Sequence, residues 1–258
     1  MSEQWSVSTL LQALGEEGSI LKQQLPASIG DLTISGLSSD SRYLQSGDLF
    51  FALNGAAAHG LNYVEQLIDG GAALILYEEA GAPTAALTRL REVGVPTFAC
   101  PNIATLLPKF AKQFYRQRLK SLTLLATTGT EGKTSVTQFI AQALRLLDES
   151  CGLIGTNGIG FLGALAENTH TTPDLLALYR SLAEIEHDFP DQPRKPVALE
   201  ATSHALDQER IAGLSFQSTL FTNLTRDHLD YHKTLRAYGS AKRALFFDYK
   251  SKASIINS

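Results

Sequence analysis

Thr127-Thr-Gly-Thr-Glu-Gly-Lys-Thr-Ser135 is the stretch that decides the fold of this chain. An apolar run at residues 122–126 precedes it, and a helical pattern of apolar residues at 136–147 follows it. A strand, a glycine-rich turn and a helix in this order form the arrangement that holds nucleotide phosphates on backbone amides. The stretch therefore predicts a phosphate-binding loop in an α/β domain. The alternative is an ordinary turn between a strand and a helix, with a lysine that is only solvated.

Each residue type in the loop suits this chemistry. Glycines let the backbone approach an anion closely, Lys133 would contact the terminal phosphates, and Thr134 would contact a magnesium ion. The residues expected to bind the nucleotide are Thr128, Gly129, Thr130, Glu131, Gly132, Lys133, Thr134 and Ser135. Two residues of the stretch Thr127–Ser135 differ from what a phosphate-binding loop usually has. Thr127 stands where the general pattern GxxxxGK(S/T) has its first glycine, and Glu131 brings a carboxylate into an anion site, so we expect its side chain to point to solvent.

Composition excludes several classes of function. The chain has 258 residues, of which 44% are hydrophobic, and a net charge of -4 without a dense basic run, so nucleic-acid binding is not expected. Two cysteines cannot form a disulfide framework and indicate a reducing compartment. Because no apolar stretch is long enough for a membrane span, we expect a cytoplasmic protein.

Short apolar runs alternate with helical patterns along the chain, which is typical of a parallel or mixed sheet covered by helices. Helices are expected at residues 7–14 (ended by Gly15 and Gly18), 62–68, 103–118, 136–147, 173–185 and 235–247, and strands within 32–53 and at 72–77, 96–99, 122–126, 151–154, 197–201, 219–221 and 253–256. A basic cluster at residues 116–120 indicates a boundary. We therefore predict a small α/β domain over residues 1–118 and a doubly wound, mostly parallel α/β domain over residues 119–258.

Polar side chains follow the predicted strands where open α/β sheets bind their ligands. Glu200 ends one strand and could hold magnesium beside the phosphate loop, or it could simply cap a helix or form an ion pair. The segment Asn223–His232 follows another strand and is dense in titratable groups. Its histidines leave a zinc site open, but its hard oxygen donors favour magnesium.

Other polar segments are less specific. Lys242 could neutralise phosphate charge, or it could lie on a solvated helix face beside Arg243. Thr171-Thr-Pro-Asp174 predicts a helix start capped by hydroxyls, and Ser38–Arg42 is a polar turn that suits a polar ligand. The glycine-rich segment Gly155–Gly163 is either a second ligand edge or a hairpin with tight turns.

Taken together, these stretches resemble the Mur ligases of peptidoglycan synthesis, and among them the members that extend UDP-N-acetylmuramoyl-L-alanyl-D-glutamate by one amino acid. The matching motifs occur in the family's order, and the family's phosphate loop also lacks the early glycine. They are Asp40-Ser-Arg42 with Gly47–Leu53, Gly129-Thr-Glu-Gly-Lys-Thr134, Thr171-Thr-Pro-Asp174, Glu200–Arg210 and Asn223–His232. The resemblance implies an N-terminal UDP-binding domain followed by an ATPase domain.

The resemblance also implies roles for individual residues. Lys133, Glu200, His228 and Lys242 would be catalytic, and Asn223 would contact the nucleotide. Magnesium would be held by Thr134, Glu200, His228 and Lys242, the last as a carbamate. The UDP-sugar peptide would contact Ser41, Arg42, His59, Thr171, Thr172, Thr202 (which replaces a more usual serine), Ser203, Gln208 and Arg210. The implied reaction converts the γ-carboxylate of D-glutamate to an acyl phosphate with ATP, and an incoming amine then displaces phosphate in a monomeric enzyme.

Several expectations concern what the resemblance does not cover. In the family the ATPase domain continues with further strands, and a third domain binds the amino acid. Neither has a counterpart before Ser258, so the chain is expected to be truncated and inactive by itself. We expect meso-diaminopimelate as the amino acid because it is the commonest acceptor in the family, with L-lysine as the alternative. Two other functions stay open: a non-catalytic module that binds the UDP-muramoyl peptide, and a small-molecule kinase with the same kind of phosphate loop.

Overall fold

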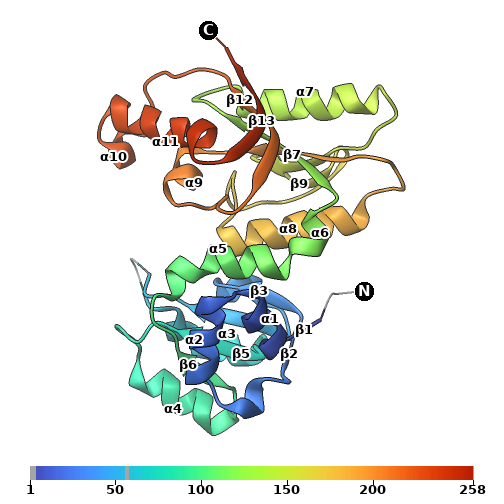
Figure 1. Cartoon of the computed structure of the whole chain (residues 1–258). Helices are drawn as coiled ribbons and strands as arrows, with labels where there is room; N and C mark the ends of the chain where they lie inside the picture. The colour runs from blue at the N-terminus through green and yellow to red at the C-terminus, as the bar shows by residue number, and fades with distance from the viewer. Residues whose placement is uncertain (1–3, 56–57, 258) are drawn as a thin grey trace. The chain divides into compact units, whose positions relative to one another are not determined.

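The structure is a computed structural model that describes residues 4–55 and 58–257. Over this part of the chain two compact units separate, Met1–Arg116 and Gln117–Ser258 (Figure 1). The fold is α/β in both units, as the alternation of apolar runs predicted.

The first unit is built on a parallel sheet with the strand order β3-β4-β5-β6. Its strands are β3 (Gly36–Ser38), β4 (Asp48–Ala52), β5 (Leu74–Tyr77) and β6 (Thr97–Ala99), and the short strands β1 (Trp5–Ser6) and β2 (Thr33–Ile34) form an antiparallel pair beside it. Every residue of β4 is buried, as expected for a strand covered on both faces. Phe50 and Ile75 pack with Leu61, Leu67 and Leu90 from the neighbouring helices and form a core.

The helices of the first unit differ in part from the prediction. They are α1 (Val7–Ala13), α2 (Glu16–Gln24), α3 (Val64–Asp69), α4 (Thr84–Val93) and α5 (Ile103–Phe114), with short 3-10 turns η1 (Ala27–Ile29), η2 (Ser41–Tyr43) and η3 (Gly60–Tyr63). Gly18 does not end a helix but lies inside α2, whose first turn carries Glu16 and Glu17, favourably placed at the positive end of the helix dipole. The helix expected over residues 103–118 is interrupted at Tyr115, and α6 (Arg116–Leu119) follows.

The second unit contains the sheet that carries the phosphate loop. Its strand order is β10-β9-β8-β11-β7-β12-β13, parallel from β8 through β13 and antiparallel at the β8, β9 and β10 edge. The strands are β7 (Leu122–Thr128), β8 (Gly152–Gly155), β9 (Gly158–Phe161), β10 (Ala164–Ala166), β11 (Lys195–Glu200), β12 (Ser215–Phe221) and β13 (Lys250–Ile256). Because β7 lies between β11 and β12, the segments that follow these two strands flank the phosphate loop.

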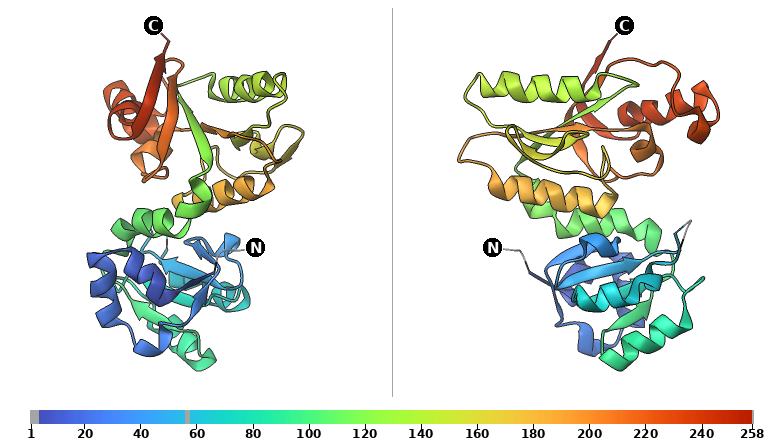
Figure 2. Two further views of the ribbon diagram at one scale, coloured as in Figure 1. Left: turned by 45° about the vertical axis from the view of Figure 1, so that its right-hand side comes forward. Right: turned by 180° about the vertical axis from the view of Figure 1, so that it is seen from behind.

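Helices cover both faces of this sheet, which confirms the doubly wound arrangement. They are α7 (Lys133–Arg145), α8 (Leu175–Asp188), α9 (Ser203–Asp207), α10 (Leu229–His232) and α11 (Leu235–Phe247). Ala141 of α7 packs on Leu153 and Ala198, whereas Ile185 of α8 lies against Gly152 on the other face. Figure 2 shows α7 and α8 on opposite sides of the sheet.

Two further expectations for this unit are corrected or decided. The short apolar run at residues 253–256 predicted a strand covered by helices, but almost every residue of β13 is exposed because, among the described residues, β13 lies at the edge of the sheet and pairs with β12 on one side. The glycine-rich segment after β8 forms the β8-β9-β10 hairpins, so the hairpin interpretation is correct for its backbone. Among the described residues, no helix combines the length and the apolar character needed to cross a membrane.

Candidate functional site

The phosphate loop joins the end of β7 to the start of α7, as predicted. Lys133 is the first residue of α7, and its Nζ donates hydrogen bonds to the carbonyl oxygens of Gly129 (3.0 Å) and Thr130 (2.8 Å). Burial lowers the pKa of Lys133, and the carboxylates of Glu200 and Asp227 partly offset this effect. The lysine is therefore folded back over its own loop, at the point where phosphates would meet the helix N-terminus.

The segment that follows β12 makes several hydrogen bonds to the phosphate loop. The carbonyl of Asn223 accepts a hydrogen bond from the Thr130 N–H (2.9 Å), and its Oδ1 accepts one from the Glu131 N–H (3.1 Å). Thr222 donates to the Glu131 carbonyl (2.5 Å), and the Thr225 N–H donates to Thr130 Oγ1 (2.9 Å). Asn223, predicted to contact the nucleotide, thus contacts the backbone of the loop; its contact with a nucleotide stays a prediction.

Gly129 is the residue on which this packing depends most. Its φ is 148°, and a Cβ there would lie 1.8 Å from Thr222 Oγ1. We expect Gly129→Ala to lower the free energy of unfolding by about 2–3 kcal/mol, because strain and a steric clash coincide. Gly163→Ala is the matched control: φ is 90° there, but a Cβ would meet nothing within 4 Å. Urea unfolding measures both variants, and an equal decrease in the free energy of unfolding in the two would contradict this explanation.

Glu131, the unexpected carboxylate, is exposed to solvent. The bonds from Thr222 and Asn223 engage its backbone groups. Because water screens an exposed charge, we expect Glu131→Asn to change the affinity for magnesium-bound ADP by less than about threefold. Calorimetric titration measures this, and affinity more than about tenfold tighter would mean that the carboxylate opposes the phosphates.

Glu200 lies at the end of β11, fully buried and directly opposite the loop. Its Oε2 accepts a hydrogen bond from Thr134 Oγ1 (2.8 Å), and its Oε1 accepts one from the Thr156 N–H (2.9 Å). The prediction that Glu200 reaches the phosphate loop is therefore matched by direct contact. A carboxylate and a threonine hydroxyl are hard oxygen donors of the kind that magnesium prefers.

Lys242 is buried within α11 and is not on a solvated helix face, so that alternative is wrong. Its Nζ donates to the carbonyl of Gly129 (2.6 Å), the same oxygen that accepts from Lys133, and lies 4.4 Å from the centre of the Tyr238 ring. Burial, together with the nearby charge of Lys133, lowers the pKa of Lys242 to about 7. A substantial fraction of this amine is therefore neutral near neutral pH.

Three histidines lie close together near Tyr238, the ring that Lys242 contacts. The rings of His204 and His228 are 4.7 Å apart, and His232, which is buried, lies 5.6 Å from His204. Burial lowers the pKa of His204 and of His232, and the neighbouring histidines lower both further. Within residues 4–55 and 58–257, no group of three or more His, Cys, Asp or Glu side chains is arranged to hold a metal ion.

A cavity of about 620 Å³ brings the loop and the other motifs together. It is lined by Thr130, Glu131, Gly132, Lys133, Thr134, Thr156, His170, Thr171, Thr172, Glu200, Thr202, His204, Arg210 and His228. Thr156, His170 and His204 were not predicted. The predicted residues of this unit that do not line the cavity are Thr128, Gly129, Ser135, Ser203, Gln208, Asn223 and Lys242.

Most of the predicted substrate residues of this unit are linked by hydrogen bonds, and Ser203 is the exception. Arg210 donates to the carbonyl of Thr172 (2.8 Å) and to Gln208 Oε1 (2.6 Å), and Thr172 Oγ1 donates to the carbonyl of Glu200 (2.7 Å). Thr202 caps α9 by accepting from the Ala205 N–H. Ser203 is buried, and its hydroxyl has no hydrogen-bond partner among the described residues.

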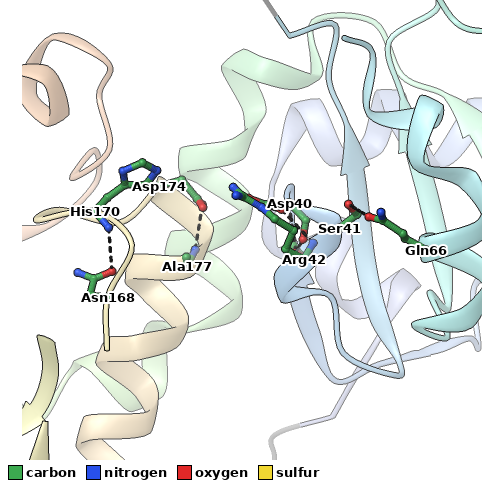
Figure 3. A network of polar contacts seen from close by, with 9 residues as sticks. Asp40, Ser41, Arg42, Gln66, Asn168, His170, Asp174 and Ala177 are labelled. Carbon is green, nitrogen blue, oxygen red and sulfur yellow. Dashed lines mark hydrogen bonds and ion pairs between the residues drawn. The ribbon is translucent and has the colours of Figure 1, made fainter. Parts of the chain in front are cut away.

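The cap of α8 corrects one prediction. Asp174, not a threonine hydroxyl, caps this helix, because its Oδ1 accepts from the N–H groups of Leu176 and Ala177 (3.0 Å each). Figure 3 shows the bond to Ala177. Thr171 and Thr172 are consequently free of the capping role and face the cavity.

The first unit holds the remaining predicted residues. Arg42 Nη2 forms an ion pair with Asp40 Oδ2 (2.6 Å), and Ser41 Oγ donates a hydrogen bond to Gln66 Oε1 (2.5 Å; Figure 3). Both ring nitrogens of the buried His59 are engaged: Nδ1 accepts from the Leu61 N–H (3.1 Å), and Nε2 donates to the carbonyl of Glu78 (2.8 Å). The tautomer of His59 is thereby fixed, and its role in substrate binding stays a prediction.

Comparisons with known proteins agree with this arrangement. The profile of the Mur ligase middle domain matches residues 127–258, and that of the Mur ligase family, catalytic domain, matches residues 33–115. A Pseudomonas aeruginosa protein named UDP-N-acetylmuramoyl-L-alanyl-D-glutamate--2,6-diaminopimelate ligase is 42% identical over 237 residues, which are 92% of this chain and 47% of that protein. A Chromobacterium violaceum protein of the same name is 39% identical over 248 residues, which are 96% of this chain and 48% of that protein.

A solved structure of a ligase with this name has a TM-score of 0.69 and 30% identity, and the match covers 90% of this chain and 45% of that chain. The chain therefore spans about half the length of the curated relatives that it matches. Since the middle-domain profile alone covers half of the sequence and contains the loop, Glu200 and Lys242, the chain belongs to the Mur ligase family.

Proposed function

We propose that this chain supplies the ATP site and the UDP-sugar-peptide site of a ligase that joins 2,6-diaminopimelate to UDP-N-acetylmuramoyl-L-alanyl-D-glutamate. The observation that carries the proposal is the hydrogen bond of 2.8 Å between Glu200 and Thr134 of the phosphate loop. The cavity beside this pair also contains Thr171, Thr172 and Arg210, where the substrate peptide would lie. Nucleotide and acceptor groups are thus expected to meet in one place, as group transfer requires.

The residues around the loop fit a magnesium-bound nucleotide. Thr134 and Glu200 would hold the ion, with His228 as a further ligand, and the loop amides and Lys133 would hold the phosphates. Bound magnesium would offset negative charge on the phosphate oxygens when the substrate carboxylate approaches. Lys133 would add a positive charge at the same place, and its hydrogen bonds to the loop carbonyls would then give way to phosphate oxygens.

Lys242 fits a second role in the same site. Its amine is buried and has a pKa of about 7, so a neutral fraction is available to react with carbon dioxide and form a carbamate with release of a proton. The carbamate would place a second carboxylate-like group beside the loop, where it could help to hold magnesium. Magnesium and Lys133 would supply the positive charge that lowers the electrostatic barrier when two anions, the phosphates and the substrate carboxylate, approach each other.

The first unit would bind the uridine diphosphate end of the substrate. Arg42 and Ser41 are both held in place by neighbouring side chains, which reduces the entropy that they lose on binding. We place the reaction in the cytoplasm and expect the protein to act as a monomer, with the UDP-linked peptide and the amino acid as its partners.

Calorimetry on the 258-residue chain tests the proposal. We expect ADP to bind more tightly with magnesium than without it, and UDP-N-acetylmuramoyl-L-alanyl-D-glutamate to bind more tightly than UDP-N-acetylglucosamine, which lacks the peptide. Nucleotide binding that is indifferent to magnesium would contradict the first half of the proposal. Equal affinity for the two UDP-sugars would contradict the second half.

A further inference from the structure

Thr156 is a residue of the cavity to which neither motif nor family resemblance gave a role. It follows β8 directly, and its side chain is exposed to the cavity. Its N–H donates to Glu200 Oε1 (2.9 Å), and its hydroxyl donates to Glu200 Oε2 (3.2 Å). One residue thus engages both oxygens of the buried carboxylate, which fixes the plane of the group as well as its position.

Gly155 explains why Thr156 can come so close. β8 runs parallel to β11, and the register pairs Ile154 with Leu199, so that Gly155 lies beside Glu200. A Cβ at Gly155 would lie 2.1 Å from Glu200 Oε1. Glu200 is 1% exposed, so it could not avoid that methyl group without leaving its hydrogen bonds. Gly155 therefore keeps open the space that the carboxylate occupies.

The hydroxyl of Thr156 also reaches the predicted substrate residues. It lies 3.0 Å from Thr171 Oγ1 and 3.4 Å from Thr134 Oγ1. Because a hydroxyl has one proton and two lone pairs, it can donate to the carboxylate and still accept from a neighbouring hydroxyl. Thr134, Glu200, Thr156 and Thr171 therefore form one connected hydrogen-bond network between the phosphate loop and the substrate side of the cavity.

We propose that Thr156 is the positioning residue of the Glu200 carboxylate: with Gly155 it holds both oxygens in the orientation that binds the divalent cation beside the phosphate loop. The cation part of this inference rests on the proposed function. Groups that orient a metal ligand from the outer shell typically change metal affinity 10–100-fold when removed. Thr156 would act in this way, since it contacts both oxygens of the carboxylate and the Thr134 hydroxyl.

Thr156→Val removes the hydroxyl but keeps the shape of the side chain and the N–H donor. We expect the enhancement of ADP binding by magnesium to fall about 10–100-fold. Binding of ADP without magnesium is expected to stay within about twofold of the wild type, and Thr156→Ser is expected to restore most of the enhancement because it restores the hydroxyl. The proposal would be overturned if magnesium enhanced ADP binding to Thr156→Val as much as to the wild type. It would also be overturned if the variant lost the same affinity for ADP with and without magnesium.

Crystal structures without any ligand test the positioning independently of nucleotide binding. In Thr156→Val and in Gly155→Ala the Glu200 carboxylate is expected to leave Thr134 Oγ1, while the β11 backbone stays in place. A carboxylate that superimposes on the wild type in both variants would overturn the inference. If the wild-type chain shows no magnesium effect at all, the proposed function fails, and these structures still decide whether Thr156 positions Glu200.

Discussion

Replacing Glu200 with Gln is expected to abolish most of the effect of magnesium on nucleotide binding, with a loss on the order of 100-fold. Gln keeps the size of the side chain and one oxygen that can accept from Thr134 or Thr156, but it removes the negative charge. The affinity for ADP without magnesium should change little or rise slightly, because a buried negative charge near the phosphates is lost. Calorimetry with and without magnesium separates the two effects.

Glu186→Gln provides the matched control for this experiment. Glu186 belongs to the same unit, but it pairs with Lys195 at 2.6 Å and does not line the cavity. Its replacement should leave the effect of magnesium within about twofold of the wild type, since this partly buried ion pair makes no contact with the residues that line the cavity. A comparable loss in both variants would mean that Glu200→Gln acts through the fold and not through the metal site.

Lys242→Met is expected to change how stability depends on pH. Burial lowers the pKa of Lys242 to about 7 in the folded chain, whereas an unfolded lysine has a pKa near 10.4. Between these two values the unfolded state binds a proton that the folded state does not, so this residue makes stability rise with pH across the window and adds no slope below it. Met removes the titrating group, and the free energy of unfolding of the variant should therefore exceed that of the wild type most at pH 6.5, by on the order of 4 kcal/mol.

Urea unfolding at pH 6.5 and pH 9.5, in buffer free of bicarbonate, measures this gain and its decline toward high pH. Arg243→Met is the control, since Arg243 is exposed on the same helix and stays charged at both values. The difference in the free energy of unfolding between Arg243→Met and the wild type should be the same at both pH values. The explanation fails if Lys242→Met keeps the pH slope of the wild type, because Lys242 would then not titrate in this window.

The sequence allowed much of the second unit to be predicted. The phosphate loop and Glu200 could be found because both follow apolar strands, and the carboxyl ends of parallel strands meet at one edge of the sheet. Thr156 obeys the same rule, since it follows β8. It was missed because its glycine-rich surroundings fit a hairpin equally well, and because only the strand order places β8 next to β11.

Other features depend on packing that a single sequence does not reveal. Lys242 and Arg243 are adjacent and both basic, yet only the way α11 packs decides that the first is buried against the loop. The sequence Thr171–Asp174 predicted a helix capped by a threonine hydroxyl, but the backbone places the carboxylate of Asp174 at the cap. In the first unit, Gly18 looked like a helix end because glycine is a poor helix former. It lies inside α2, where a Cβ would be 1.8 Å from the carbonyl oxygen of Leu11, so the close approach of α1 requires a glycine there.

A crystal structure of the chain with ADP and magnesium tests the central claim most directly. We predict the phosphates on the amides of Gly132, Lys133 and Thr134 at the N-terminus of α7, with the metal ion about 2.1 Å from Thr134 Oγ1 and from an oxygen of Glu200 or one water molecule away from it. The Lys133 ammonium should leave the carbonyls of Gly129 and Thr130 for the phosphate oxygens. A nucleotide bound elsewhere, or a metal ion that contacts neither Thr134 nor the surroundings of Glu200, would contradict the assignment of this cavity as the ATP site.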